Sequence, residues 1–117
     1  MNQEQMKRRT KEFAKQVIHL CRQLPNTREG RLIGDQIFRS GTSVGSNYRA
    51  VCRGRSKSDF IAKLGLVLEE TDETLFWLEL LFETKILKTE LLEVLLKEAN
   101  ELVAIFVSSL NKAKSLK

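Results

Sequence analysis

Arginines in one stretch of the chain offer the clearest chemistry in this sequence. If residues 27 to 53 form one helix at about 100° per residue, five of them fall within an arc of about 80°. These five are Arg28, Arg31, Arg39, Arg49 and Arg53, and Arg55 and Lys57 follow directly. Guanidinium groups pair bidentately with phosphate or carboxylate. The stripe, interrupted only by Asp35, therefore fits either a polyanion-binding surface or a solvated cationic face.

The charge of the whole chain divides sharply along its length. Residues 1–57 hold 13 Lys and Arg against 4 acids, a net +9, whereas residues 58–117 hold 7 against 11, a net −4. Two kinds of partner satisfy this division. The basic half can meet RNA or DNA, or it can meet the acidic half of a neighbouring copy.

Small residues gather on the side of this predicted helix that lies opposite the arginines. Gly34, Gly41 and Gly45 share that side with apolar residues such as Ile37 and Val44. Because glycine lacks a side chain, we expect a neighbouring helix to approach closely there. The run from Ser40 to Ser46 replaces good helix formers with Gly, Ser and Thr, so it also predicts a kink or a loosening of the helix.

Hydrophobic periodicity predicts four helices, at about residues 5–24, 27–53, 58–84 and 89–113. The only proline, Pro25, ends the first. Asn26 followed by Glu29 resembles a capping box for the second, Ser56 or Ser58 can cap the third, and Thr89 the fourth. With short loops and no alternating strand pattern, residues 1–117 are predicted to form one all-α domain, an antiparallel up-down-up-down four-helix bundle.

The third and fourth predicted helices carry more apolar residues than one seam requires. On the third, the seam of Ile61, Leu64, Leu68, Thr71, Leu75, Leu78 and Phe82 is accompanied by Phe60, Val67 and Leu81. Phe76 and Trp77 lie outside it. Such surplus surface favours a homo-oligomer. The candidate interface residues are Asp72, Phe76, Trp77, Glu79 and Glu83.

Residues for catalysis or metal binding are scarce. A di-iron bundle needs a Glu-x-x-His motif on two helices, and His19 is the only histidine. The phosphate loop G-x-x-x-x-G-K-[ST] does not occur. We therefore expect no enzyme activity, cofactor or metal. Cys21 and Cys52 are interpreted as core residues in a reducing cytoplasm, and no stretch predicts a signal peptide or membrane span.

Three motifs give the chain a family resemblance. The run from Arg39 to Ala50, RSGTSVGSNYRA, is followed by RSKSDF at Arg55 to Phe60 and LGLVLEE at Leu64 to Glu70. Nearly the whole chain resembles the small bacterial four-helix-bundle family that includes proteins encoded in intervening sequences of large-subunit ribosomal RNA genes. The accessory variability protein of diversity-generating retroelements is similar in fold.

The resemblance implies an assembly and partners. Members form rings, typically pentamers, and the retroelement protein binds nucleic acid and a reverse transcriptase. Carried to this chain, the resemblance implies that Ser43, Val44 and Asn47 shape the close helix contact. It also implies that Arg39, Arg49, Arg53 and Arg55 form a cationic surface. Many members have Glu-Gly where this chain has Val51 and Cys52, so any role of that glutamate is absent.

Overall fold

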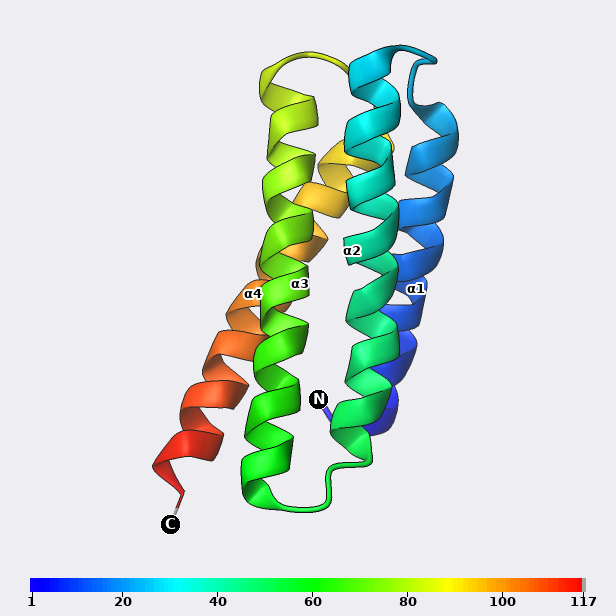
Figure 1. Cartoon of the computed structure of the whole chain (residues 1–117). Helices are drawn as coiled ribbons and strands as arrows, with labels where there is room; N and C mark the ends of the chain where they lie inside the picture. Colours follow the sequence, from blue (N-terminus) through cyan, green and yellow to red (C-terminus); the bar gives the residue numbers. More distant parts are fainter. Residues whose placement is uncertain (117) are drawn as a thin grey trace.

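Four antiparallel helices make up the computed structural model, which describes residues 1–116 (Figure 1). They are α1 (Gln3–Gln23), α2 (Arg28–Cys52), α3 (Lys57–Glu83) and α4 (Glu90–Ser115). Each helix runs opposite to the one before it, and each bound lies within two residues of its predicted position. The all-α, up-down-up-down bundle predicted from the sequence is confirmed.

Each helix begins at a side chain that accepts a hydrogen bond from the backbone of the first turn. These caps are Asn2, Thr27, Ser56 and Thr89. The expected capping box at Asn26 is wrong, because Thr27 Oγ1 accepts from the Gly30 N–H at 3.1 Å. Asn26 instead accepts from Arg31 Nη1 at 2.9 Å. A capping hydroxyl typically contributes about 1 kcal/mol to a helix, so this one-residue shift leaves α2 well anchored.

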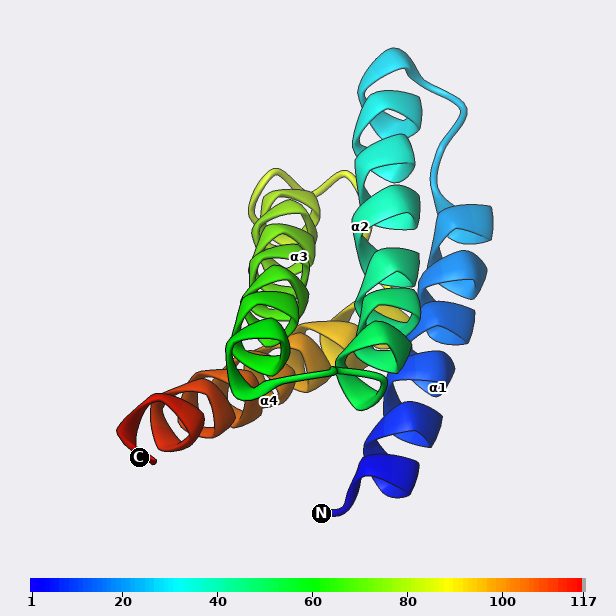
Figure 2. The ribbon, with the colours of Figure 1, turned by 60° about the horizontal axis from the view of Figure 1, so that its bottom comes forward.

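The helices are packed unequally around the core. α2 lies between α1 and α3, and α3 lies beside α4, whereas α4 crosses away from α1 towards its C-terminal end (Figure 2). Where α1 and α4 do meet, Arg9 of α1 binds Glu98 through two nitrogens at 2.7 Å and Glu101 at 2.7 Å. The hydrogen bonds that Arg9 donates to Glu98 come first among the causes that raise the pKa of Arg9 above its ordinary value. The largest fully buried side chains include Phe13, Leu20, Ile37, Leu64, Leu78 and Phe106.

The apolar surface of α3 is wider than one seam because this helix packs against α2 and α4 at once. Val67 and Leu81, expected to form an extra line outside the seam, are fully buried core residues. Phe82, expected in the seam, is 49% exposed at the end of α3. The surplus inferred from the sequence is therefore mostly core, and only Leu66 and Phe76 remain exposed on the outer side of this helix.

The run from Ser40 to Ser46 does not interrupt α2, which is one continuous helix. Its hydroxyl groups are bonded back to the preceding turn: Ser40 donates to the Gln36 carbonyl at 2.8 Å and Ser43 to the Arg39 carbonyl at 2.7 Å. These bonds satisfy the hydroxyl groups within the helix.

No helix within residues 1–116 is long and apolar enough to cross a membrane. Cys21 and Cys52 are free thiols, half-buried against the core. Burial, and then the charge of Asp35, raises the pKa of the Cys21 thiol above its ordinary value.

Candidate nucleic-acid interface

Helices α1 and α2 approach each other closely along a row of glycines. A Cβ added at Gly41 would lie 2.7 Å from Val17 Cγ2, and one at Gly45 would lie 3.2 Å from the Thr10 carbonyl oxygen. Both distances are shorter than ordinary carbon contacts. These glycines thus face α1, and they leave little depth between the two helices.

Cations from both helices surround a hollow on the outer side of this contact. The hollow has a volume of about 200 Å³, and Lys7 and Lys11 of α1 face Arg49 of α2 across it. Its remaining lining residues are small: Ala14, Thr42, Gly45 and Ser46. Three positive charges above a floor of small side chains make a concave site that suits a phosphate group.

The same surface continues along α2 towards its N-terminus. We name the whole surface the α1–α2 basic face and define it by Lys7, Lys11, Arg28, Arg31, Arg49 and Arg53. Within residues 1–116, Lys11, Arg28, Arg49 and Arg53 form no ion pair, while Lys7 reaches Glu4 at 3.1 Å. Most of the positive charge on this face is therefore not neutralised by the chain itself.

Arg55 and Lys57 lie at the end of this face, around the loop that joins α2 to α3, and both are exposed. The Arg55 backbone N–H donates to Asp59 Oδ2 at 3.1 Å, and Lys63 Nζ lies 3.0 Å from the same oxygen. The hydrogen bond from Lys63, followed by that from Arg55, holds the pKa of Asp59 below its ordinary value. The two side-chain charges of Arg55 and Lys57 remain available to a partner.

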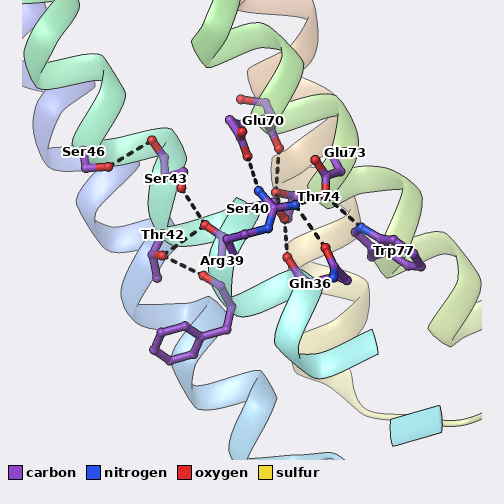
Figure 3. Close-up of polar contacts among 12 residues, drawn as sticks. Gln36, Arg39, Ser40, Thr42, Ser43, Ser46, Glu70, Glu73, Thr74 and Trp77 are labelled. Carbon is purple, nitrogen blue, oxygen red and sulfur yellow. Dashed lines mark hydrogen bonds and ion pairs between the residues drawn. The ribbon is translucent and has the colours of Figure 1, made fainter. Parts of the chain in front are cut away.

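Arg39 differs from the rest of the predicted stripe in its partners, which Figure 3 shows. Its guanidinium group turns towards α3, where Nη1 lies 3.3 Å from Glu70 Oε2 and Nη2 contacts Glu73. It also donates to Gln36 Oε1 at 3.1 Å. A cation held by two carboxylates has little net attraction for phosphate, so Arg39 belongs to the α2–α3 contact rather than to the basic face.

The other predicted packing residues of α2 also lie towards α3. Val44 is fully buried, and Ser43 and Asn47 are half-buried beside it. One turn earlier, the buried hydroxyl of Thr74 donates to Ser40 Oγ at 2.8 Å (Figure 3). The small polar residues of α2 thus join α3, and the glycines join α1.

The candidate interface residues on α3 fall into two groups. Asp72, Phe76, Glu79 and Glu83 are exposed on the outer side of the helix. Trp77 is instead half-buried against the core, and its Nε1–H donates to Glu73 Oε2 at 3.2 Å. The rings of Phe76 and Trp77 pack edge to face with centroids 5.1 Å apart. Trp77 therefore has a role within the bundle that the sequence did not reveal.

Three features of these surfaces were missed by sequence reasoning. Lys7 and Lys11 lie one turn apart on α1, a spacing that was visible, but their position beside α2 depends on the glycine contact. Phe38 is 47% exposed on α2, although its type suggested core. Gly65 lies inside α3, and a Cβ added there would meet no atom within 4 Å.

A four-helix bundle with one basic face is the class of protein that these observations define for the described residues. Residues 2–108 match the family described as 23S rRNA-intervening sequence protein, so the chain belongs to that family. The resemblance to the intervening-sequence family, drawn from the three motifs, is confirmed. The chain is also similar to a solved structure from Bacteroides thetaiotaomicron, described as a protein with unknown function from the S23 ribosomal protein family.

That likeness extends over nearly the full length of both chains. The sequences are 36% identical, the match covers 89% of this chain and 96% of that chain, and the TM-score is 0.80. None of the curated proteins matches this chain. Neither description names a reaction or a ligand.

Proposed function

We propose that this protein is a non-enzymatic RNA- or DNA-binding bundle of the cytoplasm whose α1–α2 basic face contacts phosphates without reading base sequence. The observation that carries the proposal is the hollow where Lys7, Lys11 and Arg49 converge over small residues. Phosphate contacts from several cations supply most of the affinity in non-specific nucleic-acid binding. The family description, which refers to a ribosomal RNA insert, supports the same class of partner.

The test is a binding titration in which salt is the variable. Affinity for a labelled RNA or DNA should fall steeply between low and moderate salt, because each neutralised phosphate releases counterions. The double variant Arg49→Glu with Arg53→Glu should abolish binding while helical circular dichroism is retained.

A matched control variant distinguishes an effect of the α1–α2 basic face from an effect of the net charge of the protein. Lys85→Glu with Lys88→Glu makes the same change in charge at exposed positions between α3 and α4. This control should weaken binding far less than the reversal on the α1–α2 basic face. If both double variants lose affinity equally, or the unaltered protein does not bind at low salt, the proposed function is wrong.

A second candidate function is self-association, which Gly65 specifically favours. Glycine in a helix interior costs about 1 kcal/mol relative to alanine, and nothing within the described chain approaches this one. Leu66 beside it and Phe76 further along are each 52% exposed. A neighbouring copy that covers the outer side of α3 would account for all three residues, and a ring, expected to be a pentamer by family resemblance, would repeat that contact.

Charge favours a particular partner for this side of α3. Its exposed acids, among them Asp72, Glu79 and Glu83, complement the α1–α2 basic face of another copy in a head-to-tail arrangement. Light scattering tests this candidate directly. We expect an assembled mass well above 13.5 kDa, and Phe76→Glu should lower it. A mass of one chain at micromolar concentration would remove self-association as a function.

A further inference from the structure

An exposed aromatic ring interrupts the α1–α2 basic face. Phe38 is 47% exposed, and it lines a second hollow, of about 480 Å³, together with Arg28 and Arg31. One turn further along α2, Thr42 lines the hollow that Lys7, Lys11 and Arg49 surround. The ring thus lies between two groups of cations.

The glycine contact keeps this ring on the surface. A Cβ at Gly34 would lie 2.8 Å from Leu24 Cδ1, and one at Gly41 would lie 2.7 Å from Val17 Cγ2. Helices this close have no room between them for a phenyl ring on the outer edge of α2. The bundle core does not enclose the ring of Phe38, so this ring is accessible to a partner.

The spacing of the cations suits a strand rather than a single ion. Arg31 and Arg49 are 18 residues apart on one continuous helix, which corresponds to about 27 Å along its axis. Proteins that bind single strands combine a positive track with aromatic rings on which bases stack. In a duplex the faces of the bases are covered by their neighbours, so an exposed ring on a helix surface gains little from it.

Asp35 gives the second hollow a preference for a base over a phosphate. It lines this hollow together with Phe38 and Arg31, and Asp35 forms no ion pair within residues 1–116. A carboxylate repels phosphate but accepts hydrogen bonds from the amino groups of bases. A base over Phe38 would stack on the ring and lie near Asp35, and the flanking cations would hold the phosphates on either side.

We propose that the α1–α2 basic face takes single-stranded RNA or DNA, with one base stacked on Phe38 and the backbone held on either side by Arg31 and Arg49. The proposal rests on the proposed nucleic-acid function and names its substrate class. Base selectivity is expected to be weak, because stacking on a ring accepts every base.

The first experiment compares a single strand of about 12 nucleotides with the duplex of the same sequence, at one salt concentration. The unaltered protein should bind the single strand more tightly. Phe38→Leu keeps an apolar side chain but removes the ring, and it should weaken single-strand binding about five-fold or more with no effect on the duplex. Phe38→Tyr, which keeps the ring, should retain the affinity.

Phe82→Leu is the matched control, because Phe82 is equally exposed, at 49%, and lies beside Lys85 and Lys88. It should leave single-strand binding unchanged. A second readout needs no variant: a strand that carries 5-iodouracil should cross-link to Phe38 on irradiation, and mass spectrometry of the peptides identifies the residue. Cross-linking confined to other residues would overturn the proposal even if Phe38→Leu does not fold.

The outcomes separate this inference from the proposed function. If Phe38→Leu binds like the unaltered protein while Arg49→Glu with Arg53→Glu does not bind, nucleic-acid binding stands and the single-strand inference is wrong. If neither strand nor duplex binds, the proposed function itself is wrong. If Phe38→Leu lowers the assembled mass, Phe38 is a contact between copies and the inference is again wrong.

Discussion

The α1–α2 basic face and the outer side of α3 carry opposite charges. Along α2, however, some arginines are paired with carboxylates of α3 and others are not. Arg49 on α2 forms no ion pair within residues 1–116, whereas Arg39, ten residues earlier on the same helix, is held by Glu70 and Glu73 of α3. Both arginines belong to one stripe in the sequence. The difference shows that arginines of one charged stripe can have different surroundings, because a neighbouring helix supplies the opposite charge to Arg39 and, within the described chain, not to Arg49.

The largest effect should come from removing free cations rather than paired ones. Lys11→Ala with Arg49→Ala removes two charges that are unpaired in the described chain, and Arg9→Ala with Arg39→Ala removes two that are bound to glutamates. The first pair should lower nucleic-acid affinity on the order of ten-fold or more and reduce the salt slope by about two. The second pair should leave the slope nearly unchanged.

Titrations at several salt concentrations check this prediction, with circular dichroism to confirm folding. Equal slopes for the two double variants would mean that ion pairs within the bundle do not decide which arginines contact nucleic acid. The difference in ion pairing between Arg39 and Arg49 would then have no bearing on nucleic-acid binding.

Two glycines allow the α1–α2 contact and the outer side of α3 to be compared in packing as well as in charge. Gly45→Leu places a side chain against the Thr10 carbonyl, 3.2 Å from where its Cβ would lie, and should destabilise the bundle by about 1–3 kcal/mol through overpacking. Gly65→Leu adds the same side chain where no atom lies within 4 Å. Since leucine forms helices better than glycine, this variant should be as stable as the original or more stable, by up to about 1 kcal/mol.

Thermal unfolding of the two variants measures that difference. A loss of stability in both would show that the outer side of α3 is covered, and a simultaneous fall in assembled mass for Gly65→Leu would identify a second copy as the cover. Unchanged melting for Gly45→Leu would mean that α1 can move away from α2 without cost.

Much of the fold was predictable because several local signals agree. The single proline, the capping hydroxyls at Ser56 and Thr89 and the three-to-four spacing of leucines all place helix bounds independently, and consistency of this kind specifies one structure. The wrong expectations about the core concern neighbouring helices. Whether Val67 lies in the core or outside it depends on α3 packing against two helices, which its own periodicity cannot show.

The candidate site was only partly predictable for the same reason. The direction of the arginine stripe follows from helix geometry, so Arg49 and Arg53 were identified. The assignment of Arg39 required knowledge of which α3 carboxylates lie opposite, and that of Lys11 required the contact between α1 and α2. The exposure of Phe38 depends on how closely the glycines bring α1, which no single-helix pattern records.

A smaller effect on stability is expected when the two paired arginines are replaced one at a time. The side chain of Arg9 is 22% exposed and binds both Glu98 and Glu101, so Arg9→Ala should cost about 1–2 kcal/mol of unfolding free energy. Arg39 is 49% exposed, and solvent screening limits Arg39→Ala to less than about 1 kcal/mol. Denaturant unfolding measures both, and a larger loss for Arg39→Ala would contradict the ranking.

The smallest effect concerns Asp59, the carboxylate at the end of the basic face. Its pKa in the folded chain is lowered, first by the hydrogen bond from Lys63 and then by that from the Arg55 N–H. A carboxylate with a lowered pKa contributes stability above its unfolded pKa, and the contribution disappears as the pH falls through the folded pKa. Asp59→Asn should therefore melt slightly below the unaltered protein at neutral pH, and the gap should close as the pH falls below the ordinary aspartate value of 3.8. Because Lys63 is the larger cause, the gap should also shrink when Asp59→Asn is made in a Lys63→Ala background; a gap that persists at low pH or without Lys63 would show that Asp59 acts through its fit in the loop and not through its charge.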